Sequence, residues 1–521
     1  MSLADSPFAN RLNTNYVPSD SEILEIRALL VGPADELARI DAQMKELEIA
    51  LNQLREQRAS LNGPIEAHGA LLSPIRRIPQ DILLAIFFAC LPSEHNAVID
   101  PAEAPLVLGR ICRHWRDITY STPMLWSSLH IPALSYLDAP PKLLWGLQRT
   151  VGAWLGRSGT CPLSISLFDR VNRFIPNDLE NHSLVLQLLP VAERLRHLTL
   201  IGDLPLIGPF LRLDPESLLL KSIRIELTSN ISLEDVPDLA NVLQLPTLED
   251  VTLCMSSPID PRSLPVKWCQ LTRLRLECYS IMGAQTGALD LGGAFDVLRS
   301  CPNLTNCTIQ VTKGLQDHDS TLTDISPIVL PHMHVLVFSG WIIHLQKWIP
   351  HLVVPNLRVL RVGQVILQEN AIDPTREGYM SMEIDPNEFT SSGLHELLQC
   401  FPTISHLRLS STTFPREPSA VDDAFMTLFH PPHDLCPMLT NLTIASLARF
   451  SDTTALAFVK ARMALPTPLQ ELWIRFDREM EVDVMPELHS FISNGLRIAL
   501  EYRPSPWNFV PGLGLRGQEF Y

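Results

Sequence analysis

Three short patterns contain residue types that could bind a metal or a nucleotide. Residues 430–436 read H-P-P-H-D-L-C, which offers only three zinc-type ligands and includes two prolines, whereas structural zinc sites have four ligands. His395 and Glu396 lack the second histidine of a zinc protease. Residues 512–517 read G-L-G-L-R-G but follow no strand–helix unit that would present them to a pyrophosphate. The sequence therefore predicts no metal, no cofactor and no enzyme.

Arginines recur at one position of the repeated pattern L-x-x-L-x-L, in which Ile, Val, Met, Cys or Phe can replace Leu. The pattern starts at Leu195, Leu220, Leu248, Leu271, Leu304, Met333, Leu357, Ile404, Leu439 and Leu469. In a strand, the residue between the last two apolar positions points away from the core. These residues are Thr199, Arg224, Thr252, Arg275, Thr308, Val337, Arg361, Arg408, Thr443 and Trp473. Four of the ten are arginine, and none is acidic.

This row predicts a binding surface for an acidic or phosphorylated segment, which arginine forks recognise well. Arg273 and His197 lie beside the row in the sequence. The candidate substrate-binding residues are Arg224, Arg273, Arg275, Arg361, Arg408 and Trp473. The alternative is that arginine is only a tolerated, solvated strand residue.

The repeat itself predicts how these residues are positioned. The steps between matches are 25, 28, 23, 33, 29, 24, 47, 35 and 30 residues, a spacing typical of leucine-rich repeats. Residues 163–167 resemble an earlier strand and 496–500 a final one, and helix–proline segments precede several strands. Stacked units of this kind bury one continuous core. We expect an α/β fold in which residues 160–503 form a leucine-rich-repeat solenoid (a horseshoe) and residues 504–521 a tail.

The step of 47 contains an acidic segment, residues 368–392. We interpret it as a solvated loop; a substrate-gripping or autoinhibitory element is the alternative.

A coiled-coil helix is predicted for residues 21–63, after a disordered tail at 1–20. Apolar residues alternate at steps of three and four between Leu37 and Leu61, which is the heptad spacing of a coiled coil, with Arg58 interrupting the seam. Gly32–Pro33 is expected to break this segment, with Pro33 in the first turn of the heptad-patterned helix, and Gly63–Pro64 is expected to end it. The stripe predicts either a homodimer through residues 37–61, docking of a partner helix, or packing on the rest of the chain.

A helical domain is predicted for residues 73–131. Pro79 precedes a helix that carries Ile82, Leu83, Ile86 and Phe87, and a second helix at 106–118 places Leu108, Ile111, Cys112 and Trp115 on one face. An insert of about a dozen residues separates them.

These residues resemble the F-box. The family pattern is Leu-Pro-x-Glu, then Ile-Phe, then Val-Cys-x-x-Trp; here Ile78–Asp81, Ile86–Phe87 and residues 111–115 stand in those places. The segment S-T-P-M-L-W at 121–126 follows as in the F-box-like proteins of mushroom-forming fungi. The departures are Ile78, Asp81 and the insert.

The resemblance implies docking on a Skp-type adaptor and, through it, on a cullin. The expected contact set is Ile78, Pro79, Ile82, Leu83, Ile86, Phe87, Leu108, Ile111 and Trp115. The chain would then be the non-catalytic, substrate-recognition subunit of an SCF-type ubiquitin ligase that holds a protein substrate on its repeats. The alternatives are a scaffold outside any ligase, in which the F-box-like helices only cap the solenoid, and a small-molecule sensor.

Composition narrows the class of partner. Forty-one Lys and Arg against 57 Asp and Glu give a net charge of −16, which disfavours nucleic acids and anionic membranes. No secretory leader is recognisable in residues 1–10, and the ten cysteines form no C-x-x-C pair. We therefore expect a cytoplasmic or nuclear protein without a membrane partner.

Overall fold

A computed structural model describes residues 6–72, 74–132, 140–169, 183–227, 239–255, 261–278, 289–313, 326–342, 344–363, 380–411 and 419–503. The chain divides into two compact units, Met1–Ile86 and Phe87–Tyr521, and the boundary falls inside helix α2 (Gln80–Ala89). The predicted C-terminal tail at 504–521 lies outside the described residues.

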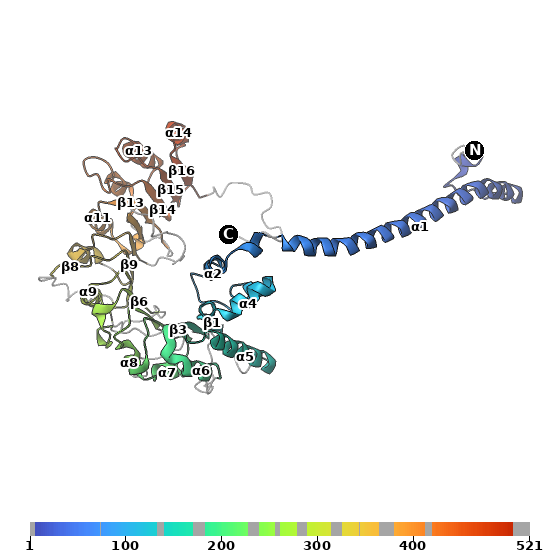
Figure 1. Cartoon of the computed structure of the whole chain (residues 1–521). Coiled ribbons are helices and arrows are strands. Elements are labelled where there is room, and N and C mark those ends of the chain that lie inside the picture. Colours follow the sequence, from blue (N-terminus) through green and yellow to red (C-terminus); the bar gives the residue numbers. More distant parts are fainter. Residues whose placement is uncertain are drawn as a thin grey trace. The chain divides into compact units, whose positions relative to one another are not determined.

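The first unit contains one long helix, α1 (Asp20–Leu71), shown in blue in Figure 1. Ser19 begins it as a capping residue, because its amide and hydroxyl both donate to the Glu22 carboxylate at 2.8 Å. The predicted helix bounds at the two Gly–Pro pairs are wrong, since Pro33 and Pro64 both lie inside α1. A proline removes one backbone hydrogen bond, and the remaining bonds carry the helix through it.

The second unit contains a parallel sheet whose fourteen strands follow the order of the sequence, β8 and β10 excepted. Neighbouring strands pair in the order β1-β2-β3-β4-β5-β6-β7-β9-β11-β12-β13-β14-β15-β16. Their bounds are β1 Ser128–Pro132, β2 Leu163–Phe168, β3 Leu195–Gly202, β4 Ser222–Leu227, β5 Asp250–Met255, β6 Arg273–Cys278, β7 Asn306–Val311, β9 Val335–Gly340, β11 Val359–Val362, β12 Met380–Ile384, β13 Ile404–Leu409, β14 Asn441–Ala448, β15 Glu471–Phe476 and β16 Arg497–Glu501. A separate two-stranded sheet joins β8 (Ile328–Val329) and β10 (Leu352–Val353).

Short helices connect the strands and lie on one side of the sheet, as α7, α8, α9, α11 and α13 do in Figure 1. Parallel neighbours require such crossovers. The helices are α3 Leu108–Ile111, α4 Arg113–Ser121, α5 Pro141–Arg157, α6 Ser183–Leu188, α7 Leu204–Leu211, α8 Leu239–Leu243, α9 Leu291–Ser300, α10 Leu345–Trp348, α11 Ser391–Gln399, α12 Asp423–Thr427, α13 Asp452–Met463 and α14 Met485–Ser493.

The repeated apolar pattern builds the core. The last two apolar positions of each of the ten matches lie on a strand, and the strands expected at 163–167 and 496–500 are β2 and β16. Every apolar position of the ten matches is at most 8% exposed. Burial alternates along most strands, so one face packs under the helices and the other stays open.

Two strands of the fourteen-stranded sheet were not predicted, and one of them corrects the interpretation of the acidic segment. Within residues 368–392, the structure places β12 at 380–384 and the start of α11 at 391, with Met380, Met382 and Ile384 buried. The solvated-loop interpretation is therefore wrong for residues 380–392, because β12 is an inner strand of the sheet between β11 and β13. Residues 368–379 lie outside the described part. The other unpredicted strand is β1.

Residues 91–105, the predicted insert between α2 and α3, cover the first edge of the sheet. The Asn96 side-chain oxygen accepts hydrogen bonds from the hydroxyls of Ser128 on β1 and Ser164 on β2, at 2.9 and 2.7 Å. The Ala97 carbonyl accepts from the amide of His130 on β1 at 2.8 Å. These contacts occupy backbone and side-chain groups that an open edge would expose.

The S-T-P-M-L-W segment is also part of this end. Trp126 is fully buried, donates to the Thr119 carbonyl at 2.8 Å and packs edge-on against Trp154 of α5 at 4.8 Å between ring centroids. The Arg157 guanidinium lies 4.7 Å over the Trp126 ring. This segment therefore holds α4 and α5 on the start of the sheet.

At the C-terminal end of the sheet, several groups hydrogen-bond to one buried carboxylate, that of Asp452. It accepts two hydrogen bonds from Arg478 at 2.8 and 3.2 Å, one from each backbone amide of Glu481 and Val482, and one from Tyr502 at 3.0 Å. Burial acts to raise the pKa of Asp452, but the hydrogen bonds from Arg478, the two amides and Tyr502 lower it to about 2. The charged carboxylate thus ties α13 to the segment after β15 and to the chain after β16.

No helix in the described ranges is long and apolar enough to cross a membrane.

Candidate protein-interaction sites

Helix α2 carries apolar residues on two sides. It follows Pro79, whose carbonyl accepts the amide of Leu83 at 3.0 Å, and Asp81 lies in its first turn. Leu83 is fully buried, whereas Ile82 is 50% and Ile86 37% exposed. Ile82 and Ile86 are four residues apart, so they share one side of the helix. This side presents an apolar surface that the structure leaves open.

The second predicted helix is divided in two, which corrects its expected face. The backbone is extended at Cys112, between α3 and α4, and the Cys112 sulfur accepts the Trp115 amide as a cap. Leu108 and Trp115 are consequently buried, while Ile111 is 54% exposed. The Trp115 ring packs on Phe87 with 4.8 Å between centroids.

The predicted adaptor-contact set therefore separates into two groups. Four residues are buried and do not face a partner: Leu83, Phe87, Leu108 and Trp115. Ile82, Ile86 and Ile111 are exposed, Pro79 is exposed and Ile78 is half-buried. Phe88, which is 36% exposed on α2, was not among the predicted contacts, because it follows the Ile-Phe pair of the family pattern.

The predicted row of outward-facing residues lies in register across the sheet. Adjacent pairs include Thr199 with Arg224, Thr252 with Arg275 and Thr443 with Trp473. The full row runs His130, Ser166, Thr199, Arg224, Thr252, Arg275, Thr308, Val337, Arg361, Glu383, Arg408, Thr443, Trp473 and Ala499. The open face is thus a continuous surface that carries the candidate arginines.

Three of the candidate arginines each have their own carboxylate. Arg224 lies 3.2 Å from Glu226 and Arg275 3.0 Å from Glu277. Period-two alternation could have identified both acids, because each stands two residues after its arginine on the same face. Arg273 lies 2.9 Å from Asp250 on the neighbouring strand. Trp473 donates its indole N–H to Glu501 at 3.0 Å.

Arg361 and Arg408 instead share one carboxylate. Glu383 lies between them in the row, with Nε of Arg361 at 3.4 Å and Nε of Arg408 at 3.2 Å from its two oxygens. The Ser410 hydroxyl also donates to Glu383, at 3.2 Å. The prediction that this row contains no acid is wrong, because β12 was not predicted. Two guanidiniums against one carboxylate leave one positive charge here.

Two groups beside the first arginines are desolvated. Burial lowers the pKa of His197, with smaller opposing effects of nearby charges. Burial and the neighbouring Glu277 raise the pKa of the Cys254 thiol to about 12. The Cys254 thiol is therefore protonated near neutral pH and is not prepared for nucleophilic chemistry.

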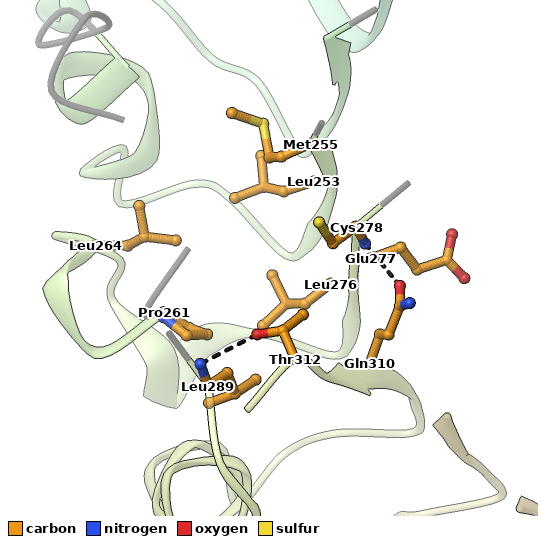
Figure 2. A pocket seen from close by; sticks show the side chains of 10 residues that line it. All are labelled: Leu253, Met255, Pro261, Leu264, Leu276, Glu277, Cys278, Leu289, Gln310 and Thr312. Atoms are coloured by element: carbon orange, nitrogen blue, oxygen red, sulfur yellow. Dashed lines mark hydrogen bonds between the residues drawn. The ribbon is translucent and has the colours of Figure 1, made fainter. Parts of the chain in front are cut away.

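A small cavity lies at the ends of β5, β6 and β7, and Figure 2 shows its lining. It holds about 30 Å³, which is room for one or two water molecules. The side chains of Gln310 and Thr312 accept the amides of Cys278 and Leu289, at 2.7 and 3.2 Å. The polar groups therefore fix the local backbone, and the space is too small for a cofactor.

Residues 430–436 form a loop in which His433 and Asp434 are exposed and Cys436 is buried. Among the residues that the structure describes, no group of three or more His, Cys, Asp or Glu side chains is placed to hold a metal ion. The Gly-rich residues 512–517 lie outside the described part.

The sequence matches no model of a known protein family, and no curated protein matches it.

Proposed function

We propose that this protein is a substrate-recognition adaptor of an SCF-type ubiquitin ligase. Its F-box-like helices dock on a Skp-type adaptor, and the open face of the sheet holds a protein substrate near the ubiquitin-charged enzyme, so that its contribution to catalysis is proximity. The observation that carries the proposal is the exposed apolar side of α2, with Ile82 50% and Ile86 37% exposed. Exposed apolar side chains at this spacing are typical of a docked helix.

The repeat domain is interpreted as a leucine-rich-repeat horseshoe. The sequential order of the parallel strands, the helices on one side and the buried repeat positions support this interpretation. The fold would leave the open face as an extended surface for a protein ligand.

Of the candidate arginines, Arg361 and Arg408 are the two that we propose to bind an acidic or phosphorylated segment of the substrate. In the part of the chain that the structure describes, these two arginines share one carboxylate, that of Glu383. Arg408 is 52% exposed in its side chain, so it can reach a ligand. An incoming phosphate would replace Glu383 as the acceptor of these donors.

The second candidate is a repeat scaffold without a ligase role, in which the helices only cap the sheet. The hydrogen bonds of Asn96 to β1 and β2 and the Trp126–Trp154 contact favour a capping role for residues 96–132. Capping uses buried groups, and it gives no reason for exposed isoleucines on α2.

Co-expression with a Skp-type adaptor separates the two candidates. The adaptor proposal predicts a stable complex for the wild type and none for Ile82→Asp/Ile86→Asp, with the fold intact by circular dichroism. Phe87 is not a suitable target, because it is buried against Trp115 and its replacement would unfold the helices. A wild-type chain that ignores the adaptor would leave the scaffold as the function.

A further inference from the structure

Helix α1 carries an uncovered apolar seam. Between Leu37 and Leu61, the seven apolar residues at heptad positions a and d are 43 to 69% exposed. The structure continues the helix to Leu71, which adds Ile65, 65% exposed, at the next a position. A seam of this length, repeating every seven residues, matches a second helix with the same repeat.

The charges beside the seam argue against a parallel pair. In a parallel coiled coil, position g faces position e five residues on in the partner. Glu36 would then face Asp41 of the second copy, twice by symmetry. Arg58, at an a position, would face Arg58 of the second copy inside the seam. Within residues 36–62, which flank the seam, no oppositely charged g–e pair offsets these contacts.

An antiparallel pair removes each of these conflicts. Position a then faces d, and position e faces e of the second copy. When Leu51 faces Leu54 of the second copy, Met44 faces Leu61 and Ile40 faces Ile65, and the longer helix observed here makes the last layer possible.

The same register pairs opposite charges. Glu48 faces Arg55 of the second copy, twice by symmetry, and Arg58 lies against Leu47 of the second copy, one residue from that copy's Glu48. Asp41 faces Asn62, so no two acids meet at the e positions. The complementarity of the e positions fits a second copy of this chain.

We propose that two copies of this protein associate through α1 as an antiparallel two-stranded coiled coil in which Leu51 of one copy packs on Leu54 of the other. This pairing does not depend on the adaptor function. A dimer formed in this way would contain two copies of the parallel sheet.

Charge exchange tests both the association and its register. Sedimentation equilibrium of the full-length chain at about 0.1 M salt should show a dimer. Glu48→Arg and Arg55→Glu should each weaken it about tenfold, because each converts two opposite-charge contacts into like-charge ones. The double variant Glu48→Arg/Arg55→Glu should restore the wild-type affinity. Glu46→Arg, at an outer position of the same helix, is the matched control and should change nothing.

Three results would overturn the proposal. If the chain is monomeric at all concentrations, a second copy does not bind the seam, and the proposal is wrong even if a different protein covers it. Single reversals without effect would favour a parallel pair, in which Glu48 faces Gln43 and Arg55 faces Ala50. Failure of the double variant to restore the dimer would exclude this register.

Discussion

Replacing Asp452 with alanine should locally unfold the C-terminal end of the sheet. The Asp452 side chain is fully buried and accepts five hydrogen bonds, two of them from Arg478. Alanine would leave the Arg478 guanidinium, itself only 16% exposed, without its counter-charge, and two backbone amides without an acceptor.

The size of the loss follows from these contacts. Removing one partner of a buried ion pair costs about 3–5 kcal/mol, because the other charge stays buried and unpaired. The pair of Arg449 and Asp477, at 3.2 Å and with the Arg449 side chain 43% exposed, offers a comparison in the same region, just after β14 and β15. Its loss through Arg449→Ala should cost below about 1 kcal/mol.

Hydrogen exchange read by mass spectrometry measures this region separately from the rest of the chain. Amides of β15 and β16 should exchange about 100-fold faster or more in Asp452→Ala, since about 3 kcal/mol corresponds to that factor. Strands β3 to β5 should be unchanged. If Asp452→Ala and Arg449→Ala behave alike, the buried carboxylate does not hold this end together.

Three further outcomes are expected. Gly363→Ala should destabilise the second unit by about 1–3 kcal/mol in urea unfolding, because φ is +111° at this position and an added Cβ would collide with Cβ of Asp385. The pKa of Asp452 is lowered from 3.8 to about 2, so the charged carboxylate stabilises the fold fully above about pH 4, and this stabilisation is lost as the pH falls toward 2. In unfolding titrations, the wild type should be more stable than Asp452→Asn by at most about 2 kcal/mol, and this difference should shrink between about pH 4 and pH 2. Iodoacetamide mapping at pH 8 should label the exposed Cys90 well before Cys254, whose burial raises its thiol pKa to about 12.

The repeat core was predictable because its signal is periodic. Three apolar positions per strand, repeated ten times, specify which residues are buried and which face outward, and Arg224 and Arg275 lie on the face that alternation assigns. Strand β12 was not predicted, because it lies in an acidic segment and its outward-facing position is occupied by Glu383. A charged residue is tolerated there, since two arginines on adjacent strands neutralise it.

The interaction sites were less predictable, because exposure depends on tertiary packing. Spacing alone placed Leu83 and Ile82 in one contact set, and only the structure separates the buried residue from the exposed one. The break at Cys112 had no clear sequence signal, since neither glycine nor proline stands there. The ion pairs of Arg224 and Arg275 could have been predicted only by considering the acid two residues after each of them on the same strand.

We expect the exposed side of α2 to bind a Skp-type adaptor. This binding is measured by isothermal titration calorimetry, in which purified adaptor is titrated into the chain. The matched control is Leu143→Asp, which replaces an α5 residue that is 54% exposed. Ile82→Asp/Ile86→Asp should weaken binding about 100-fold or more, because burying each isoleucine contributes about 1.5 kcal/mol or more, while Leu143→Asp should bind as the wild type does. Equal affinities for the two variants, or no binding by the wild type, would contradict the account.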